Sequence, residues 1–450
     1  MKVVKFGGSS VANAEQISKI IEVVTSDADR RIVVVSAPGK RFGDDVKVTD
    51  LLIALADAVL AGNDFETQLV AVVERYAEIQ RDLDLSADVV ATIEADLRGR
   101  IETRGANDLQ FMDAMKAAGE DCNARVIAEA FTRAGFPAIY VNPGEAGMLL
   151  SDEFGNAEVL DESFEKLSSL KDSEEIVIFP GFFGVTKGGE VATFPRGGSD
   201  ITGAILAAAV KADVYENFTD VDSVCAMDPR LIENPPAIDC MTYREMRELS
   251  YAGFGVFHDE AIIPAVHAEI PICIKNTNNP SAPGTMVVPK REPEHGSVVG
   301  ISSASGFCSI YIDKYMMNRE VGFGRRLLQI LEEEGVSFEH TPSGIDNISV
   351  IMASANISDT KEEHVLSRIQ TELQPDAVSV EHGLALVMVV GEGMQYTPGM
   401  AARATEAFHE AGVNLEMVNQ GASEISMMFA VKDSDREKAI RALGSAFFGI

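Results

Sequence analysis

The chain has 450 residues, too many for one ordinary domain, so we expect two or three. It carries 38 Lys and Arg against 70 Asp and Glu, and this formal net charge of -32 argues against a nucleic-acid partner, because phosphates would be repelled. No apolar run approaches the ~18 residues that a membrane span requires. The cysteines are scattered and form no C-x-x-C pair, which argues against structural zinc or disulfides and favours a reducing cytoplasm; they are Cys122, Cys225, Cys240, Cys273 and Cys308.

Short apolar runs alternate with helical patterns over the first two thirds of the chain. A helix is predicted around Ile17–Val24 from its i, i+3, i+4, i+7 spacing, and a buried helix over Gly203–Val210, which is apolar all round. Strand–helix alternation predicts a largely parallel sheet covered on both faces. The predicted strands are Val3–Phe6, Ile32–Val35, Ala138–Val141, Ile176–Phe179, Val214–Phe218 and Ile272–Ile274.

The stretch 278–300 is polar and rich in proline, and we interpret it as a linker between domains. Beyond it the chain repeats itself at a shift of 77 residues, which brings three glycines onto glycines and suggests two β-α-β-β-α-β modules. The matched pairs are Gly322 with Gly399, Gly335 with Gly412, and Gly344 with Gly421.

The first motif, K-F-G-G-S-S-V-A, places Lys5 and Phe6 at the end of a strand and Gly7 and Gly8 before a helix. Glycines allow close approach of the backbone to a phosphate, and helix-start N–H groups favour an anion. Lys5 could then contact a phosphoryl group. The motif is neither a Walker A loop nor G-x-G-x-x-G, and a plain tight turn is an equally good interpretation.

The second motif, R-G-G-S-D over Arg196–Asp200, opens the buried helix and adds an arginine able to bind a carboxylate through two hydrogen bonds. Asp200 could alternatively be a helix N-cap. Two Gly-Gly helix starts suit two anionic ligands that face each other, as phosphoryl transfer requires. The third motif, T-D-V-D-S from Thr219, follows a predicted strand, where ligands bind in open α/β sheets; an ordinary polar loop is the alternative.

Glu120 lies in an Ala-rich helical stretch and could accept a hydrogen bond from a substrate amino group, although most helical glutamates are simply solvated. His258, Asp259 and Glu260 are consecutive and cannot all face one ion on regular structure, so we predict no metal site formed by the protein there.

Together these motifs, with G-F-F-G at Gly181–Gly184 and D-P-R at Asp228–Arg230, resemble the aspartokinases over nearly the whole chain. The resemblance implies an α/β amino-acid kinase fold, carbamate-kinase-like, as a three-layer sandwich with a mainly parallel sheet. Two ferredoxin-like βαββαβ ACT repeats follow it. The implied boundaries are 1–298 for the catalytic domain, 305–382 for the first repeat and 383–450 for the second.

The resemblance also implies the reaction: ATP, arriving with Mg²⁺, phosphorylates L-aspartate to 4-phospho-L-aspartate, at the entry to lysine, threonine and methionine synthesis. Lys5 and Asp200 would be catalytic, and the remaining roles divide between nucleotide and substrate. Nucleotide contacts would come from Lys5, Phe6, Gly7, Gly8, Thr219, Asp220, Cys225, Arg230 and Gly255. Aspartate contacts would come from Ser36, Thr49, Glu120, Arg196, Gly197, Gly198 and Ser199.

Two departures from the family pattern concern the nucleotide. Cys225 stands where many members have tyrosine, and Gly255 where many have a lysine that touches the nucleotide. For the repeats the resemblance implies a lysine or threonine effector and a homodimer, with a tetramer as a further possibility. No dinucleotide-binding motif follows the second repeat, so we expect a monofunctional enzyme. The implied effector residues are Met317, Gly322, Phe323 and Glu339.

Two other functions stay open at this level. A glutamate or acetylglutamate kinase would share the fold, although the C-terminal repeats and T-D-V-D-S argue against it. A non-catalytic amino-acid sensor is suggested by Gly255 and Cys225, whereas the retained Lys5, Glu120 and Arg196 argue for catalysis.

Overall fold

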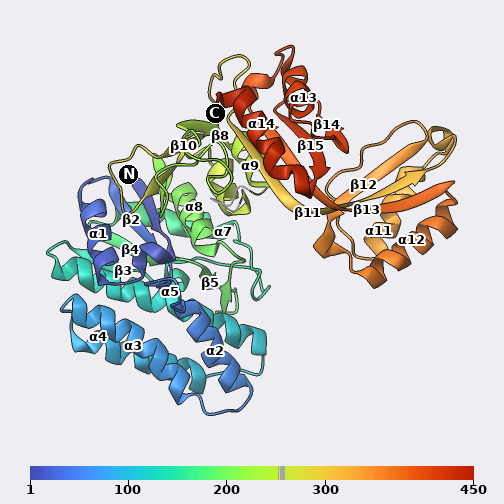
Figure 1. Ribbon diagram of the computed structural model, residues 1–450. Helices are drawn as coiled ribbons and strands as arrows, with labels where there is room; N and C mark the ends of the chain where they lie inside the picture. Colours follow the sequence, from blue (N-terminus) through green and yellow to red (C-terminus); the bar gives the residue numbers. More distant parts are fainter. Residues whose placement is uncertain (252, 254–258) are drawn as a thin grey trace. The chain divides into compact units, whose positions relative to one another are not determined.

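The computed structural model describes residues 1–251, 253 and 259–450 (Figure 1). They form two units, each described here by itself. The N-terminal unit comprises Met1–Val224, Asp239–Tyr243 and Val256–Arg291, and the C-terminal unit comprises Cys225–Ile238, Arg244–Gly255 and Glu292–Ile450. Among the described residues there is no helix that is both long and apolar enough to span a membrane.

The N-terminal unit is built on a sheet with the strand order β3-β4-β2-β1-β7-β9-β10-β8 in the described ranges. All six strands predicted from apolar runs are confirmed. Neighbours from β3 to β9 run parallel, and β10 is antiparallel to β9. The strands are β1 (Lys2–Phe6), β2 (Arg30–Val35), β3 (Ala138–Tyr140), β4 (Ile176–Pro180), β7 (Val214–Thr219), β8 (Cys240–Thr242), β9 (Ile272–Asn276) and β10 (Thr285–Val288), with a separate hairpin of β5 (Phe183–Val185) and β6 (Val191–Thr193).

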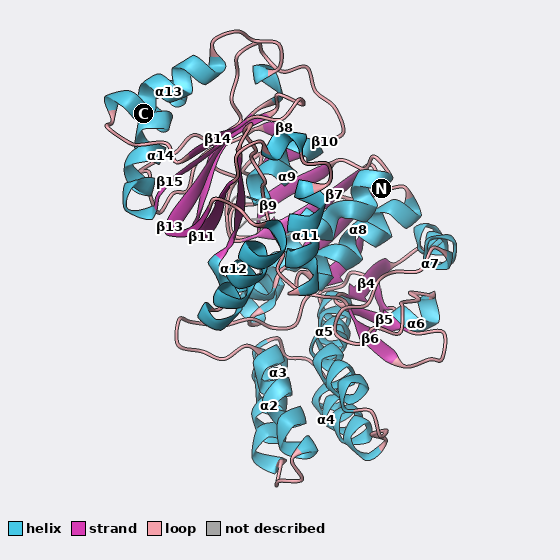
Figure 2. Ribbon diagram, turned by 90° about the vertical axis from the view of Figure 1, so that its right-hand side faces the viewer, coloured by secondary structure: helices cyan, strands magenta, loops and turns pink. Residues whose placement is uncertain are grey.

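Helices cover both faces of this sheet, because successive side chains of a strand point to opposite faces. Val4 and Phe6 of β1 join the core beneath α1 and α5, and α2, α3 and α4 pack outside α5 at the lower end of Figures 1 and 2. Helix α8 covers the opposite face of β1 and β7. The helices are α1 (Ala14–Thr25), α2 (Val48–Leu60), α3 (Glu66–Asp82), α4 (Ala87–Glu102), α5 (Asp108–Arg133), α6 (Pro143–Ala146), α7 (Glu162–Leu167), α8 (Gly198–Val210) and α10 (Ile263–His267), with 3-10 turns η1 (Gly8–Val11), η2 (Ser168–Asp172) and η3 (Asp259–Ile262).

The predicted linker is wrong in one part. Thr285–Val288 forms β10, which lies between β9 and β8 in the sheet. Prolines at 283 and 289 flank this strand rather than interrupt it, so a proline-rich composition hid a four-residue strand. The helix predicted after Gly8 is also delayed: the turn η1 comes first, and α1 begins at Ala14 after an Asn13 cap.

The C-terminal unit contains a sheet with the strand order β12-β11-β13-β15-β14 in the described residues. The internal repeat is confirmed by backbone geometry. Gly322 and Gly399 precede α11 and α13 with φ of 82° and 92°, and Gly335 and Gly412 follow those helices with φ of 62° and 60°. The elements are α9 (Tyr243–Tyr251), β11 (Gly300–Asp313), η4 (Met317–Arg319), α11 (Phe323–Glu333), β12 (Asn347–Ala353), η5 (Ser354–Asn356), α12 (Asp359–Leu373), β13 (Ala377–Val390), η6 (Glu392–Met394), α13 (Met400–Glu410), β14 (Met417–Asn419), β15 (Ser426–Lys432), η7 (Asp433–Asp435) and α14 (Arg436–Phe448).

Strands β11 and β13 each serve both repeats. The segment 307–313 of β11 pairs with 377–384 of β13, whereas 300–305 pairs with 385–390, beside β15. The second repeat therefore includes a strand segment, 300–305, that precedes the first repeat in the chain. A prediction of two consecutive modules does not include this exchange. The domain boundaries 1–298, 305–382 and 383–450 stay a prediction.

Candidate active site

The carboxyl ends of the central parallel strands bring the first and second motifs together. Strand β1 lies between β2 and β7. The strands that come next in the chain are on one side of β1 and the later strands β7 and β9 are on the other, so the strand order changes direction at β1. Ligands bind beyond the carboxyl ends of strands at such a point. Lys5 is only 7 % exposed and its side chain faces α8, where its Nζ lies 2.6 Å from Oδ1 of Asp200.

The turn after β1 is held against the segment that follows β2. The N–H of Gly39 donates to the carbonyl of Gly8 at 2.8 Å, and the N–H of Ser36 donates to the carbonyl of Phe6 at 3.2 Å. A Cβ added to Gly39 would lie 2.6 Å from the carbonyl carbon of Gly8, so the two backbones touch only because a glycine is there. The N–H groups of Gly8 and Ser9 start η1, where helical N–H groups have no partner within the turn.

The start of α8 has an unusual geometry. Gly197 is its N-cap with φ of 85°, and no side chain caps the helix, so the interpretation of Asp200 as N-cap is wrong. Gly198 and Ser199 follow, both buried. A Cβ at Gly181 would lie 2.6 Å from Oγ of Ser199, which explains the first glycine of G-F-F-G. Arg196 is exposed, and no ion pair in the described part of the chain involves it.

Glu120 lies on α5 beside the segment after β2. It is 6 % exposed, and burial raises its pKa to about 8, against opposing contributions from the N–H of Ala37 and the charge of Lys5. Its Oε2 is buried without a hydrogen-bond partner among the described residues. A Cβ at Gly119 would lie 2.8 Å from the Cβ of Ala37, so this glycine lets α5 approach. The site therefore holds an acceptor with unused capacity.

Two further predicted substrate residues lie on neighbouring elements. Ser36 directly follows β2 and is half-buried, and its carbonyl accepts a hydrogen bond from Nδ2 of Asn123 at 2.7 Å. Thr49 is the second residue of α2 and is also half-buried. The printed contacts thus join β1, the segment after β2, α5 and α8 at this edge of the sheet.

The predicted nucleotide residues fall into two groups. Thr219 ends β7, where its carbonyl accepts from the N–H of Thr277 and its Oγ1 accepts from the N–H of Val221, and Asp220 follows, exposed. Cys225 and Arg230 belong to the C-terminal unit, where Arg230 pairs with Asp228 at 2.7 Å and is therefore not a free cation. Gly255 and His258 lie outside the described residues.

The structure adds residues that the motifs did not single out. Asn123 and Asn217 are buried to 0 % and 1 % exposure, and each donates to a group of the site, Ser36 or Asp200. Phe182 adopts φ of 76°, rare for a side-chain-bearing residue, and packs against Gly198. A polar residue inside an apolar strand, as in V-Y-E-N-F-T, was the available signal for Asn217.

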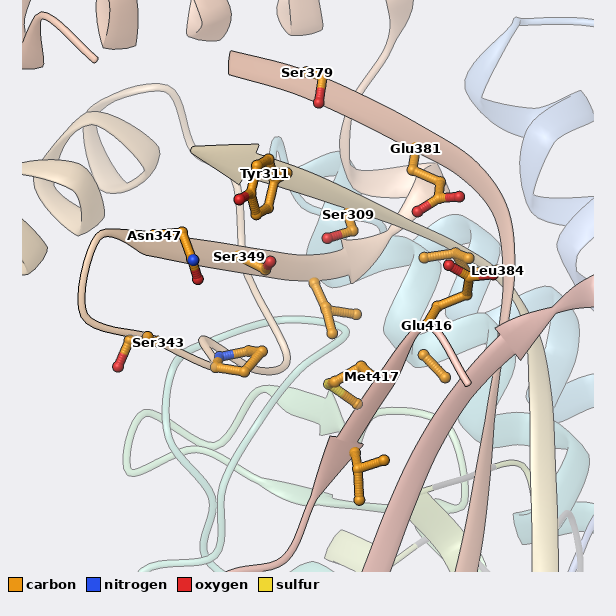
Figure 3. Close-up of a pocket in the computed structure, with 15 residues that line it drawn as sticks. Ser309, Tyr311, Ser343, Asn347, Ser349, Ser379, Glu381, Leu384, Glu416 and Met417 are labelled. Carbon is orange, nitrogen blue, oxygen red and sulfur yellow. The ribbon is translucent and has the colours of Figure 1, made fainter. Parts of the chain in front are cut away.

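The four predicted effector residues lie in the first repeat. Met317 and Phe323 are buried in its core, and Gly322 is the N-cap of α11. The carboxylate of Glu339 accepts from the hydroxyl of Tyr251, and burial raises its pKa. A separate pocket of ≈ 570 Å³ lies on the polar sheet face (Figure 3), and none of the four is among the described residues that line it, such as Tyr311, Ser349 and Glu416.

Comparisons with known proteins agree with this geometry. Residues 1–276, more than half of the chain, match the amino acid kinase family, and residues 387–447 match the ACT domain. The chain is 55 % identical over 448 residues to aspartokinase 3 of Bacillus subtilis, covering 100 % of this chain and 99 % of that protein. It is 29 % identical to the chloroplastic aspartokinase 1 of Arabidopsis thaliana, covering 99 % of this chain and 80 % of that protein.

Solved structures give the same result. The aspartate kinase of Clostridium acetobutylicum matches with a TM-score of 0.89 and 38 % identity over 99 % of this chain and 100 % of that one. Aspartokinase III of E. coli, in complex with aspartate and ADP, matches with a TM-score of 0.77 and 26 % identity over 100 % of both chains. The Lys5 site, the duplicated C-terminal module and these full-length matches agree, and the chain belongs to the aspartokinase family.

Proposed function

We propose that this chain transfers the γ-phosphoryl group of ATP to the side-chain carboxylate of L-aspartate at the edge formed by β1, β2 and α8. The product, 4-phospho-L-aspartate, enters the synthesis of lysine, threonine and methionine. The observation that carries the proposal is the Lys5–Asp200 contact of 2.6 Å, located between a Gly-Gly turn and a second glycine-rich helix start. Two anion sites facing one lysine are what in-line phosphoryl transfer needs.

The phosphoryl group would lie between the ammonium of Lys5 and the N–H groups that start η1. Phosphoryl transfer develops charge on the transferring oxygens, and fixed positive groups in a site shielded from water stabilise it. Asp200 holds the ammonium of Lys5 at the start of α8 through their contact of 2.6 Å. A chain of net charge -32 repels ATP at long range, so ATP must be bound by the positive groups within the site itself.

Aspartate would bind on the other side of Lys5. Its ammonium would take the unused acceptor of Glu120, and its carboxylates would meet Arg196 and the N–H groups of Gly198 and Ser199 at the start of α8. Ser36 and Thr49 would contribute hydroxyls from the ends of β2 and α2. Arg196 is exposed and unpaired in the described structure, so it can turn to the ligand without first breaking an ion pair.

For the nucleotide we propose contacts from Phe6, Thr219 and Asp220. Contacts from Cys225, Gly255 and Arg230 stay predictions from the resemblance. The described residues contain no group of three or more His, Cys, Asp or Glu side chains that could hold a metal. We propose that Mg²⁺ enters with ATP and is held mostly by phosphate oxygens and water, as this ion prefers. It would neutralise phosphate charge during transfer.

We further propose feedback regulation through the C-terminal repeats, in a cytoplasmic homodimer that these repeats form and that could pair into a tetramer. Aspartokinase III of E. coli has been solved in complex with lysine and aspartate in a T-state. Lysine is therefore our first candidate effector and threonine the second, bound near Met317, Gly322, Phe323 and Glu339. Glu339→Gln should weaken inhibition by lysine without changing uninhibited turnover, whereas an unchanged inhibition curve would argue against this location.

The test of catalysis is a coupled assay of ADP release with aspartate, glutamate and acetylglutamate, each with and without lysine or threonine. We expect aspartate-dependent turnover, and loss of it in Lys5→Ala with the circular-dichroism spectrum unchanged. Faster turnover with glutamate would mean a different amino-acid kinase. Calorimetric lysine binding with no turnover on any substrate would mean a sensor, and undiminished turnover in Lys5→Ala would refute the role of Lys5.

A further inference from the structure

A buried asparagine lies beside the Lys5–Asp200 pair and has no place in the roles above. Asn217 is on β7, directly opposite Lys5 in the parallel pairing of β1 with β7. Adjacent strands in register point paired side chains to the same face. Lys5 and Asn217 therefore both face α8, and Asn217 is only 1 % exposed.

Asn217 and Lys5 share one acceptor atom. Nδ2 of Asn217 donates to Oδ1 of Asp200 at 2.6 Å, and Nζ of Lys5 contacts the same oxygen at 2.6 Å. Nδ2 of Asn217 also lies 3.3 Å from the hydroxyl of Tyr215, which in turn donates to the carbonyl of Asp200 at 3.2 Å. The start of α8 is thus joined to β7 through both the side chain and the backbone of Asp200.

Tyr215 is part of the same arrangement. A Cβ at Gly203 would lie 2.6 Å from its ring, so the helix approaches Tyr215 only through a glycine. Burial raises the pKa of Tyr215 well above its usual value, which keeps the hydroxyl neutral and able to donate.

An asparagine at this position is costly for a strand. Its Oδ1 is buried without a partner among the described residues, and unsatisfied buried polar atoms are rare in folded proteins. An aliphatic residue would suit a buried strand better. The position therefore retains an amide donor despite this cost. In the described part of the chain, Asp200 is the one charged group to which this amide donates.

We propose that Asn217 is a positioning residue for phosphoryl transfer, an inference that rests on the proposed function of the Lys5 site. Its amide occupies one lone pair of Asp200 Oδ1 and fixes the orientation of that carboxylate. Lys5 then forms a single contact with Asp200 instead of pairing with both oxygens. An ammonium has three N–H donors, so two remain available for the transferring phosphoryl group.

Two nearly isosteric substitutions separate this role from simple packing. Asn217→Leu keeps the branching and the number of side-chain heavy atoms, although its methyl groups are bulkier, and it removes the donor. We expect kcat to fall by about 10- to 100-fold while the KM for aspartate changes less than about threefold. Asn217→Asp places a second carboxylate beside Asp200, and one of two adjacent carboxyls retains a proton to higher pH. That protonated group again donates to Asp200. The kcat of Asn217→Asp relative to wild type should therefore rise about tenfold or more as pH falls from 9 to 6.

The matched control is Ile205→Val, which removes one methylene from a fully buried apolar position of α8. This variant should keep the wild-type kcat, and its pH profile should be parallel to that of the wild type. Its loss of thermal stability should be small and comparable to that of Asn217→Leu. If Asn217→Leu does not fold, Asn217→Asp measured across pH carries the test alone. Wild-type kcat in Asn217→Leu, or a pH profile of Asn217→Asp parallel to wild type, would overturn the inference. Absence of aspartate-dependent turnover in the wild-type chain would instead overturn the proposed function.

Discussion

Replacing Glu120 with glutamine tests the central electrostatic feature of the site. Glu120 is 6 % exposed, and burial raises its pKa to about 8 from the ordinary value of 4.5. Below pH 4.5 the carboxyl is protonated in both the folded and the unfolded chain, so it contributes nothing to the pH dependence of stability. As pH rises from 4.5 through 8 the unfolded chain ionises first, and the folded state loses stability relative to it.

The size of this stability loss follows from the difference between the folded and unfolded pKa values of Glu120, about 3.5 pKa units. At about 1.4 kcal/mol per pKa unit, this corresponds to about 5 kcal/mol of lost stability above pH 8, an upper limit because water entry and relaxation soften the effect. Glu120→Gln carries no ionisable group and lacks this loss. The variant should gain stability over wild type as pH rises, with little difference at pH 5.

Urea unfolding followed by circular dichroism at pH 5, 7 and 9 would measure this gain. Two structural units can give more than one transition, so the comparison applies to the transition that contains the N-terminal unit. A stability difference between the two proteins that stays constant from pH 5 to pH 9 would refute the raised pKa of Glu120.

The same carboxyl links aspartate binding to proton release. At pH 7 a group with a pKa of about 8 is about nine-tenths protonated, and it must ionise to pair with the substrate ammonium. Calorimetry in two buffers of different ionisation enthalpy should therefore show release of close to one proton on binding at pH 7, and affinity that rises up to pH 8. Glu120→Gln should bind aspartate weakly and release no such proton. Equal proton release by both proteins would contradict the assignment.

Two substitutions test the geometry further. Gly39→Ala should lower kcat by more than about tenfold, because its Cβ would lie 2.6 Å from the backbone of Gly8 and displace the turn after β1. The control is Gly99→Ala on α4, whose Cβ would have nothing within 4 Å; it should keep its activity and gain up to about 1 kcal/mol of stability. Equal activities in the two variants would argue against this contact. Arg196→Ala should raise the KM for aspartate about 10- to 100-fold. Its melting temperature should not change, because the side chain is exposed and unpaired among the described residues. A lower melting temperature with an unchanged KM would instead mean that Arg196 is a structural residue.

Much of the fold could be predicted from local patterns. The six strands, the buried helix that became α8, and the duplicated module with its matched glycines all follow from apolar spacing and from glycine at positive φ, both of which act over a few residues. Strand β10 was missed because four residues between prolines carry too little pattern to separate a strand from a loop.

The site could be predicted only in part. The sequence predicts Lys5, Gly7 and Gly8, and the Arg196–Asp200 segment, because glycines at a helix start are visible in the sequence itself. The burial of Glu120 depends on Gly119 admitting α5 to the segment after β2, and the shared acceptor of Lys5 and Asn217 depends on the pairing of β1 with β7.

The amino-acid sequence by itself therefore determined which elements form and which motifs can bind anions, because these depend on the order of neighbouring residues. The tertiary structure alone decided how those groups act on one another. Lys5, Glu120, Asp200 and Asn217 are separated by up to 212 positions in the chain. Their charges and hydrogen bonds interact only after the sheet, α5 and α8 have packed and excluded water, and this packing raises the pKa of Glu120 and directs Asp200 towards Lys5.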